Sequence, residues 1–176
     1  MKRVTATLAV LMFSVCAAFA QPGAWVKYET TVGRYSISMP SKPSESGQDT
    51  TAKTGETLKQ YLAMAMDGEA VFLAGYMDLT PGMTFNFDEG KSAMARGMNA
   101  TAGDSRLISL GGAPGREYEL NGLMSNDVPF IDYVRTYQVG QRIYVLQHLI
   151  PASEKGAATS AKTSKFFDSF SVVTPK

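Results

Sequence analysis

The residues best suited to acid–base chemistry are the single histidine and a group of carboxylates close to it in the sequence. His148 is the only histidine of the 176-residue chain, and Glu117, Glu119, Asp127 and Asp132 precede it. A histidine can act as a general base, and paired carboxylates can act as acid and base. Glu117 and Glu119 share one face of a predicted strand, and Asp132 lies on a strand expected to pair nearby. The pattern is therefore compatible with a small hydrolase that uses His148 and these carboxylates.

A structural role accounts for the same residues more simply. No serine or cysteine nucleophile motif accompanies His148, and one histidine cannot complete a typical zinc site. His148 shares a strand face with Tyr144 and Leu146, which favours a structural position near the end of a strand. The carboxylates would then cover the solvated face of a sheet. No Asp-x-Asp-x-Asp-Gly loop supports calcium binding, so we assign no catalytic residue.

The methionines are a further candidate for chemistry, because thioether sulfur is a soft ligand that suits Cu(I). Met64 and Met66 share a face of a predicted strand, and Met94 and Met98 share a face of a predicted helix. The same positions are predicted core positions, where methionine fills gaps. A methionine-rich periplasmic copper-binding protein is therefore an alternative, but we assign no metal ligand and expect no cofactor. The methionines after the first twenty residues are Met39, Met64, Met66, Met77, Met83, Met94, Met98 and Met124.

Two short motifs resemble binding or modification sites but lack the necessary context. The glycine-rich stretch Gly111–Gly115 lies between two predicted strands, whereas a phosphate-binding loop leads into a helix. We interpret it as a turn. Asn99-Ala100-Thr101 matches an N-glycosylation sequon, but it falls on a predicted helix and we discount it.

The first twenty residues have the pattern of a secretory signal peptide. Lys2 and Arg3 form a basic start, an apolar stretch follows, and Ala18–Ala20 is a small-x-small cleavage site. We predict cleavage after Ala20, a periplasmic or secreted location, and no integral membrane segment in the mature chain. Cys16 suggests lipidation as an alternative, but the preceding residues lack the leucine and the small residue of a lipoprotein site.

The remaining residues, 21–176, form a near-neutral chain without cysteine. The whole chain has 17 basic and 16 acidic residues, and the signal contains two of the basic ones, which leaves 15 against 16 and a net charge of −1. This balance gives no basic face for nucleic acid and no polybasic patch for membranes. The only cysteine is Cys16, so the mature chain has no disulfides. Its length is that of one domain with its own core.

The elements that position these residues are mainly β-hairpins. Val128–Pro151 holds the densest run of aromatic and β-branched residues and predicts two strands joined at Val139–Arg142. Asp67-Gly68 predicts a tight turn between two further strands. The other predicted strands are Trp25–Glu29, Arg34–Met39, an exposed strand within Ser44–Gly55, Leu58–Met66, Ala70–Leu79, Ser105–Leu110, Arg116–Leu120 and Phe170–Val173.

Two helices are predicted between these strands. Asn86 with Glu89 three residues later resembles a capping box, and Gly103 is expected to end that helix. Ser153 is expected to cap a second helix, Glu154–Asp168. We therefore predict an α+β domain with a central, mainly antiparallel sheet of about six to eight strands flanked by two helices.

Four short stretches resemble a known family. They are Gly33–Pro40 (GRYSISMP), Gly115–Tyr118 (GREY), Arg135–Val145 (RTYQVGQRIYV) and Phe166–Phe170 (FFDSF). Together they resemble exported bacterial domains of unknown function with the PsbP-like fold, a fold that also includes DcrB-type envelope proteins and Ran-release factors. The resemblance implies a single PsbP-like domain over residues 21–176. Such families share a fold and not one activity, so the resemblance implies no catalytic residues.

These observations favour an exported, non-enzymatic binding or assembly module of the bacterial cell envelope. It would act through a groove between sheet and helices or through a protein partner, and the partner would be an envelope protein or a small molecule. The copper-binding protein and the small hydrolase are the alternatives.

Overall fold

The computed structural model describes residues 24–51 and 55–173. The predicted signal peptide, its cleavage site after Ala20 and Cys16 lie outside the described residues. Within the described part of the chain, no helix is long and apolar enough to span a membrane.

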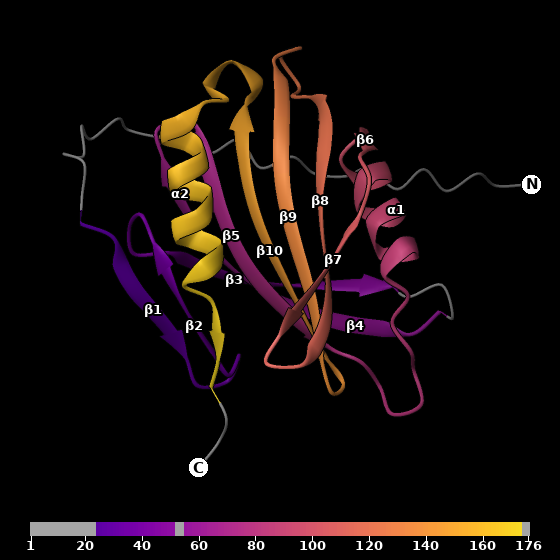
Figure 1. Cartoon of the computed structure of the whole chain (residues 1–176). Coiled ribbons are helices and arrows are strands. Elements are labelled where there is room, and N and C mark those ends of the chain that lie inside the picture. The colour runs from indigo at the N-terminus through magenta and orange to yellow at the C-terminus, as the bar shows by residue number, and fades with distance from the viewer. Residues whose placement is uncertain (1–23, 52–54, 174–176) are drawn as a thin grey trace, which may run out of the picture.

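The chain forms strands, a helix, more strands, a second helix and a last short strand (Figure 1). In order, the elements are β1 (Val26–Thr30), β2 (Tyr35–Met39), β3 (Ser44–Thr51), β4 (Thr57–Asp67), β5 (Ala70–Asp78), α1 (Phe87–Gly97), β6 (Ala100–Ala102), β7 (Arg106–Leu110), β8 (Ala113–Leu123), β9 (Pro129–Val139), β10 (Arg142–Pro151), a 3-10 turn (Ala152–Glu154), α2 (Ala157–Asp168) and β11 (Ser171–Val172).

An antiparallel sheet of eight strands is the main feature of the fold. Its order is β3-β4-β5-β10-β9-β8-β6, and β7 also pairs with β8. The β9–β10 hairpin lies at its centre, with Val139 opposite Arg142 and Gly140 at a φ of 61° in the turn. Both the α+β class and the strand number of the prediction are confirmed.

A second sheet of three strands, β1-β2-β11, was not expected as a separate sheet. β2 is its central strand, and β11 joins it from near the end of the chain through Ser171, which pairs with Ser36. In Figure 1 this small sheet lies beside the lower end of α2. The individual strand predictions for its members are correct, but strand patterns alone do not tell which strands pair.

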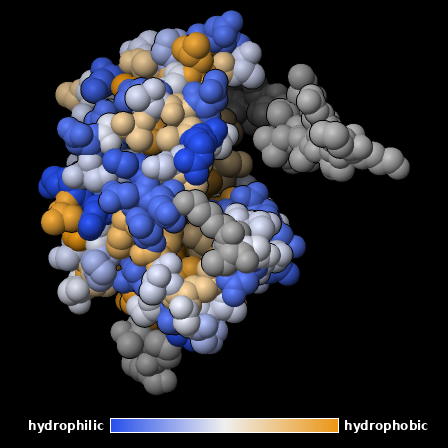
Figure 2. Space-filling model, turned by 90° about the vertical axis from the view of Figure 1, so that its right-hand side faces the viewer, coloured by the Kyte–Doolittle hydropathy of each residue, from blue (hydrophilic) through white to orange (hydrophobic). Residues whose placement is uncertain are grey.

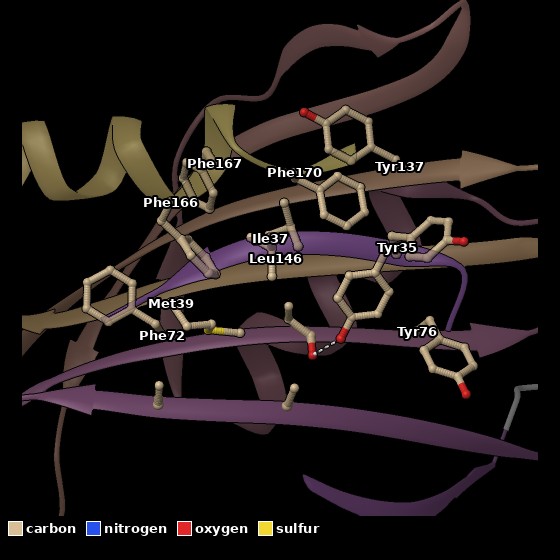
Figure 3. Packing of buried hydrophobic residues seen from close by; sticks show 14 of the residues in the cluster. Tyr35, Ile37, Met39, Phe72, Tyr76, Tyr137, Leu146, Phe166, Phe167 and Phe170 are labelled. Carbon is tan, nitrogen blue, oxygen red and sulfur yellow. Dashed lines mark hydrogen bonds between the residues drawn. The ribbon is translucent and has the colours of Figure 1, made fainter. Parts of the chain in front are cut away.

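The larger core lies on the sheet face that carries α2 and the small sheet. Figure 3 shows Tyr35, Met39 and Phe72 packed with Phe166 and Phe170 between these layers. Aromatic rings dominate, and the edge-to-face contacts of Tyr35 with Tyr144 and of Phe72 with Phe166 suit the ring quadrupoles. The Tyr35 hydroxyl donates a hydrogen bond to the Ala74 carbonyl at 3.3 Å, which joins the small sheet to β5.

The smaller core lies on the opposite face, under α1. Tyr118, Val134 and Val145 are buried there against Ala95, the one fully buried residue of α1. Each helix thus covers a different face of the same sheet (Figure 1).

The helix ends differ from the prediction. α1 begins as expected, because the Asn86 side chain accepts hydrogen bonds from the backbone N–H groups of Asp88 and Glu89. It ends at Gly97 rather than Gly103, because Asn99 takes a positive φ of 50° and the chain turns into β6. The sequon at Asn99 therefore lies at a helix–strand junction.

The second helix begins later than expected. Ser153 belongs to a 3-10 turn, and α2 starts at Ala157 after Gly156, which takes the N-cap position without a side-chain cap. The glycine-rich stretch is a turn as predicted, since Gly111 and Gly112 connect β7 to β8 with φ angles of 56° and 87°.

Candidate functional site

His148 lies in the main core and not at a surface. It is fully buried on β10, and its ring stacks on Phe72 with 4.0 Å between ring centroids. The Thr163 hydroxyl donates to the Thr159 carbonyl at 2.8 Å, so the His148 Nδ1, 2.8 Å from that hydroxyl oxygen, must donate its proton to it. The Nε2 atom has no hydrogen-bond partner in the described part of the chain.

The electrostatics of His148 agree with this packing role. Burial lowers its pKa to about 4, and the nearby Lys162 charge acts in the same direction. The ring is therefore neutral at pH 7. The Thr163 hydroxyl accepts from His148 rather than donating to it, which is the opposite of the arrangement a general base would need.

The sheet separates the carboxylates that the sequence placed close together. β8 and β9 pair as expected, with Leu120 opposite Asp132. Glu117 and Glu119 face α2, whereas Asp132 faces α1 and is fully buried. Asp127 lies in the exposed turn between the two strands, at a φ of 61°. The expectation of one shared carboxylate surface is therefore wrong, because Asp132 and Glu117 project from opposite faces.

A groove of about 560 Å³ lies between α2 and the outer strands of the large sheet. We call it the α2 groove. β8 and β9 form its floor, α2 forms one wall, and the segment between β6 and β7 forms the other. Its lining residues are Gly103, Asp104, Arg106, Glu117, Tyr118, Glu119, Asn121, Tyr133, Arg135, Ser160, Thr163, Ser164 and Phe167.

An ion-pair network fixes the charged side chains of the α2 groove. Glu117 accepts hydrogen bonds from Arg106 and from Arg135, and Arg135 also donates to Asp168 at 3.0 Å. The Arg135 guanidinium lies over the Phe167 ring, 4.7 Å from its centroid. Burial alone would raise the pKa of Glu117, but the two guanidinium groups outweigh it and hold the pKa below its usual range. The groove therefore presents fixed charges of both signs.

The hydroxyl groups of the groove lack the features of an activated nucleophile. Ser160 donates to the Gly156 carbonyl at 3.0 Å, and Thr163 donates within α2 as described above. Neither donates to a histidine or to a carboxylate, which an activated hydroxyl requires. The arrangement suits recognition of a polar ligand better than acyl or glycosyl transfer.

A second, smaller cleft of about 380 Å³ lies between the small sheet and the β3–β4 edge. Four tyrosines line it, namely Tyr28, Tyr35, Tyr61 and Tyr76, together with Glu45. Burial and a hydrogen bond to Glu45 raise the pKa of Tyr28 to about 12, so its phenol is neutral at pH 7. Sequence reasoning did not find this cleft, because its tyrosines come from four different strands.

The methionines divide into separate groups. Met39 is fully buried in the main core. Met64 and Met66 are 41% and 49% exposed, so the prediction that they lie in the core is wrong. Ala63 and Ala65 take the inward positions of β4 instead. Met94 and Met98 do pack under α1, next to Gln147 of β10.

The described residues contain no group of three or more histidine, cysteine, aspartate or glutamate side chains that could hold a metal ion.

The charged network of the α2 groove was not predicted from the sequence. The register of β8 against β9 places Arg135 opposite Glu117, and this pairing would have been the signal, but register is not visible in strand patterns.

Figure 2 views the molecule from the side that carries α1. Hydrophobic residues appear there as separate patches among hydrophilic ones, and no single broad apolar face is visible.

Comparison with known proteins identifies the fold. No family model matches the chain, and no curated protein matches it. The solution structure of cyanobacterial PsbP (CyanoP) from Synechocystis sp. PCC 6803 is similar, with a TM-score of 0.61 and 12% sequence identity over 90% of this chain and 98% of that one. The chain therefore has a PsbP-like fold.

Two further solved structures are more distant. A protein from Bacteroides thetaiotaomicron gives a TM-score of 0.47 and 11% identity over 84% of this chain and 48% of that one. A protein of unknown function from Pseudomonas aeruginosa gives a TM-score of 0.42 and 7% identity over 81% of this chain and 93% of that one.

Proposed function

We propose that the protein is an exported, non-enzymatic binding or assembly module of the bacterial cell envelope, and that the α2 groove holds its ligand. The α2 groove itself is the observation that carries the proposal. Its volume of about 560 Å³ falls within the range of ligand sites in proteins. Arg135 is held by Glu117, Asp168 and the Phe167 ring, so a ligand meets charged groups that are already ordered.

The lining indicates the kind of ligand. Arg106 and Arg135 supply donors, Glu119 and Asp104 supply acceptors, and the Tyr133 ring supplies an apolar surface. A peptide segment of an envelope protein or a polar small molecule offers matching donors and acceptors. A strongly charged polymer does not fit, because the lining contains both signs in similar number.

Other observations support a non-enzymatic role and export. His148 is buried and neutral, and Glu117 is fully engaged by two arginines, which weakens the hydrolase alternative. The PsbP-like fold hosts no single activity, so it does not favour an enzyme. Export rests on the basic, apolar and small-residue pattern of the first twenty residues.

Site-specific photo-crosslinking in the native host tests the proposal. A photoreactive amino acid replaces Ser164, an exposed residue of α2 that lines the α2 groove. The control replaces Lys59, an exposed residue of β4 that lines neither the α2 groove nor the tyrosine-lined cleft. We expect a discrete crosslinked product from the Ser164 position, found in the envelope fraction and absent from the Lys59 position.

Arg135→Ala, combined with the Ser164 photoprobe, should abolish the crosslinked product. The same products from the Ser164 and Lys59 positions would exclude the α2 groove as the site. Recovery of the protein only in the cytoplasm, with its first twenty residues intact, would exclude export. Turnover of esterase or glycosidase substrates that is lost in His148→Ala would favour the hydrolase instead.

A further inference from the structure

Asp132 is the only buried carboxylate among the described residues. Its carboxyl group is fully buried between β9 and α1. Its Oδ2 atom accepts a hydrogen bond from the Gln147 amide nitrogen at 2.6 Å, but its Oδ1 atom has no partner among the described residues. Burial of a carboxylate is costly unless the group is paired and hydrogen-bonded. A cation bound beside the Asp132 carboxylate would offset this cost and stabilise the folded protein.

Among the described residues, no cationic side chain contributes to the surroundings of Asp132. Burial raises its pKa, the Gln147 hydrogen bond opposes that rise, and no neighbouring charge contributes. Two thioether sulfurs lie close by instead. The Gln147 amide nitrogen that donates to Asp132 lies 3.6 Å from Met94 Sδ and 3.9 Å from Met98 Sδ. One nitrogen atom is therefore shared by a carboxylate and two methionine sulfurs.

The two thioether sulfurs decide which class of metal ion fits here, because a carboxylate alone would suit hard ions. Calcium and magnesium require about six or more oxygen ligands, and structural zinc requires thiolate, imidazole or carboxylate in a tetrahedral set. Thioether sulfur suits soft ions, and Cu(I) is the soft ion that methionine sites select. A monovalent cation also neutralises the single charge of Asp132 without leaving an excess of either sign.

We propose that Asp132, Met94 and Met98 form a Cu(I) site between α1 and the eight-stranded sheet. The Gln147 amide nitrogen now lies where the ion would bind, so its side chain must turn away when Cu(I) enters. Met94 and Met98 are only partly buried, and their unbranched side chains rotate easily. They therefore provide an entry path from solvent and can close on the ion.

This site is separate from the α2 groove, because α1 and α2 cover opposite faces of the sheet (Figure 1). The proposal also limits the copper-binding methionines to Met94 and Met98. Met64 and Met66 are exposed on β4 and serve as natural controls for methionines that bind copper only adventitiously.

Anaerobic titration of the purified protein with Cu(I), against a chromogenic Cu(I) chelator, measures the affinity and stoichiometry. We expect one Cu(I) per chain. Removal of a residue that only supports a metal ligand lowers metal affinity by roughly 10–100-fold. The Met94→Leu/Met98→Leu double variant removes two ligands, so its Cu(I) affinity should fall by more than this. Met64→Leu/Met66→Leu should bind Cu(I) as the wild type does. Asp132→Asn keeps the size of the side chain but removes its charge, and should also weaken binding.

Methyl-selective NMR of methionine-labelled wild type tests the site without any variant. Cu(I) should shift the Met94 and Met98 methyl signals and leave those of Met64 and Met66 in place. Shifts confined to Met64 and Met66, or absence of Cu(I) binding, would overturn the proposal. Undiminished affinity in a folded Met94→Leu/Met98→Leu variant would overturn it as well.

Discussion

Two buried titratable residues, His148 and Asp132, lie on opposite faces of the large sheet. They differ in the hydrogen bonds that their side chains make. His148 donates its one ring proton to Thr163 and stacks on Phe72, so it is stable as a neutral ring. Asp132 has one satisfied oxygen and one without a partner. Both lie in the central hairpin, and each keeps one polar atom without a partner among the described residues. The unpaired atom of Asp132 belongs to a carboxyl group, whereas that of His148 belongs to a neutral ring.

Neutral burial of His148 makes the protein sensitive to acid. Its pKa falls from 6.5 to about 4 on folding, so the unfolded chain binds the proton more tightly. The stability that this provides is fully present above pH 6.5 and is lost as the pH falls toward 4, by on the order of 3 kcal/mol. In His148→Asn the free energy of unfolding should be lower at pH 7.5 and should fall less steeply with pH.

Urea unfolding of both proteins at several pH values from 7.5 to 4.5 measures this difference. Parallel curves for wild type and His148→Asn would show that another group causes the acid sensitivity.

The alternation of side chains along one strand predicts well which of its residues share a face. It does not tell whether residues on two different strands share a face. It placed His148 with Tyr144 and Leu146, and all three are buried on one face. It could not place Asp132 relative to Glu117, because the face of β9 that meets α2 depends on the register with β8. It also made Met64 a core residue, since an apolar side chain on a half-buried strand fits either face.

Helices and strands with a clear sequence pattern could be predicted. The residue at which such an element begins or ends could be predicted only where a neighbouring side chain fixes it. The β9–β10 hairpin follows from two aromatic, β-branched runs around Gly140, whose positive φ the turn requires. The start of α1 follows from the Asn86 cap. The start of α2 does not follow from Ser153, because the chain first makes a 3-10 turn and reaches the helix at Gly156.

The Asn86 cap is the element-scale contact that is simplest to test. Its side chain accepts from two backbone N–H groups at 3.0 and 3.1 Å. Asn86→Ala should therefore lower the free energy of unfolding by about 1 kcal/mol. Ser92→Ala is the matched control, because its hydroxyl bonds the Asp88 carbonyl within the same helix and its loss should change stability by less than about 0.5 kcal/mol.

Urea denaturation of the three proteins checks the prediction. Equal effects of the two substitutions would indicate that packing against the sheet, and not the cap, holds the start of α1.

The small sheet joins distant parts of the chain, which is why the sequence did not reveal it. β11 pairs with β2 although Ser171 and Ser36 lie 135 positions apart, and their hydroxyls are 2.9 Å from each other. Val173 donates its backbone N–H to the Arg34 carbonyl at 2.8 Å. The Tyr144 hydroxyl donates to the Gly33 carbonyl at 3.0 Å and ties the same region to the large sheet. Such pairings depend on tertiary packing and leave no local signal.

Because β11 closes the small sheet at the end of the chain, its removal should loosen that sheet selectively. Deletion of residues 171–176 removes the Ser171 and Val172 pairs with β2 but keeps the Phe170 ring in the core. The expected loss is on the order of 2 kcal/mol, from a few hydrogen bonds and one half-buried valine. Native-state hydrogen exchange should show lower protection in β1 and β2, with β9 and β10 unchanged. Deletion of residues 174–176 alone keeps β11 and serves as the matched control. Equal loss of protection across both sheets would show instead that the two sheets unfold as one unit, with β11 stabilising the whole domain.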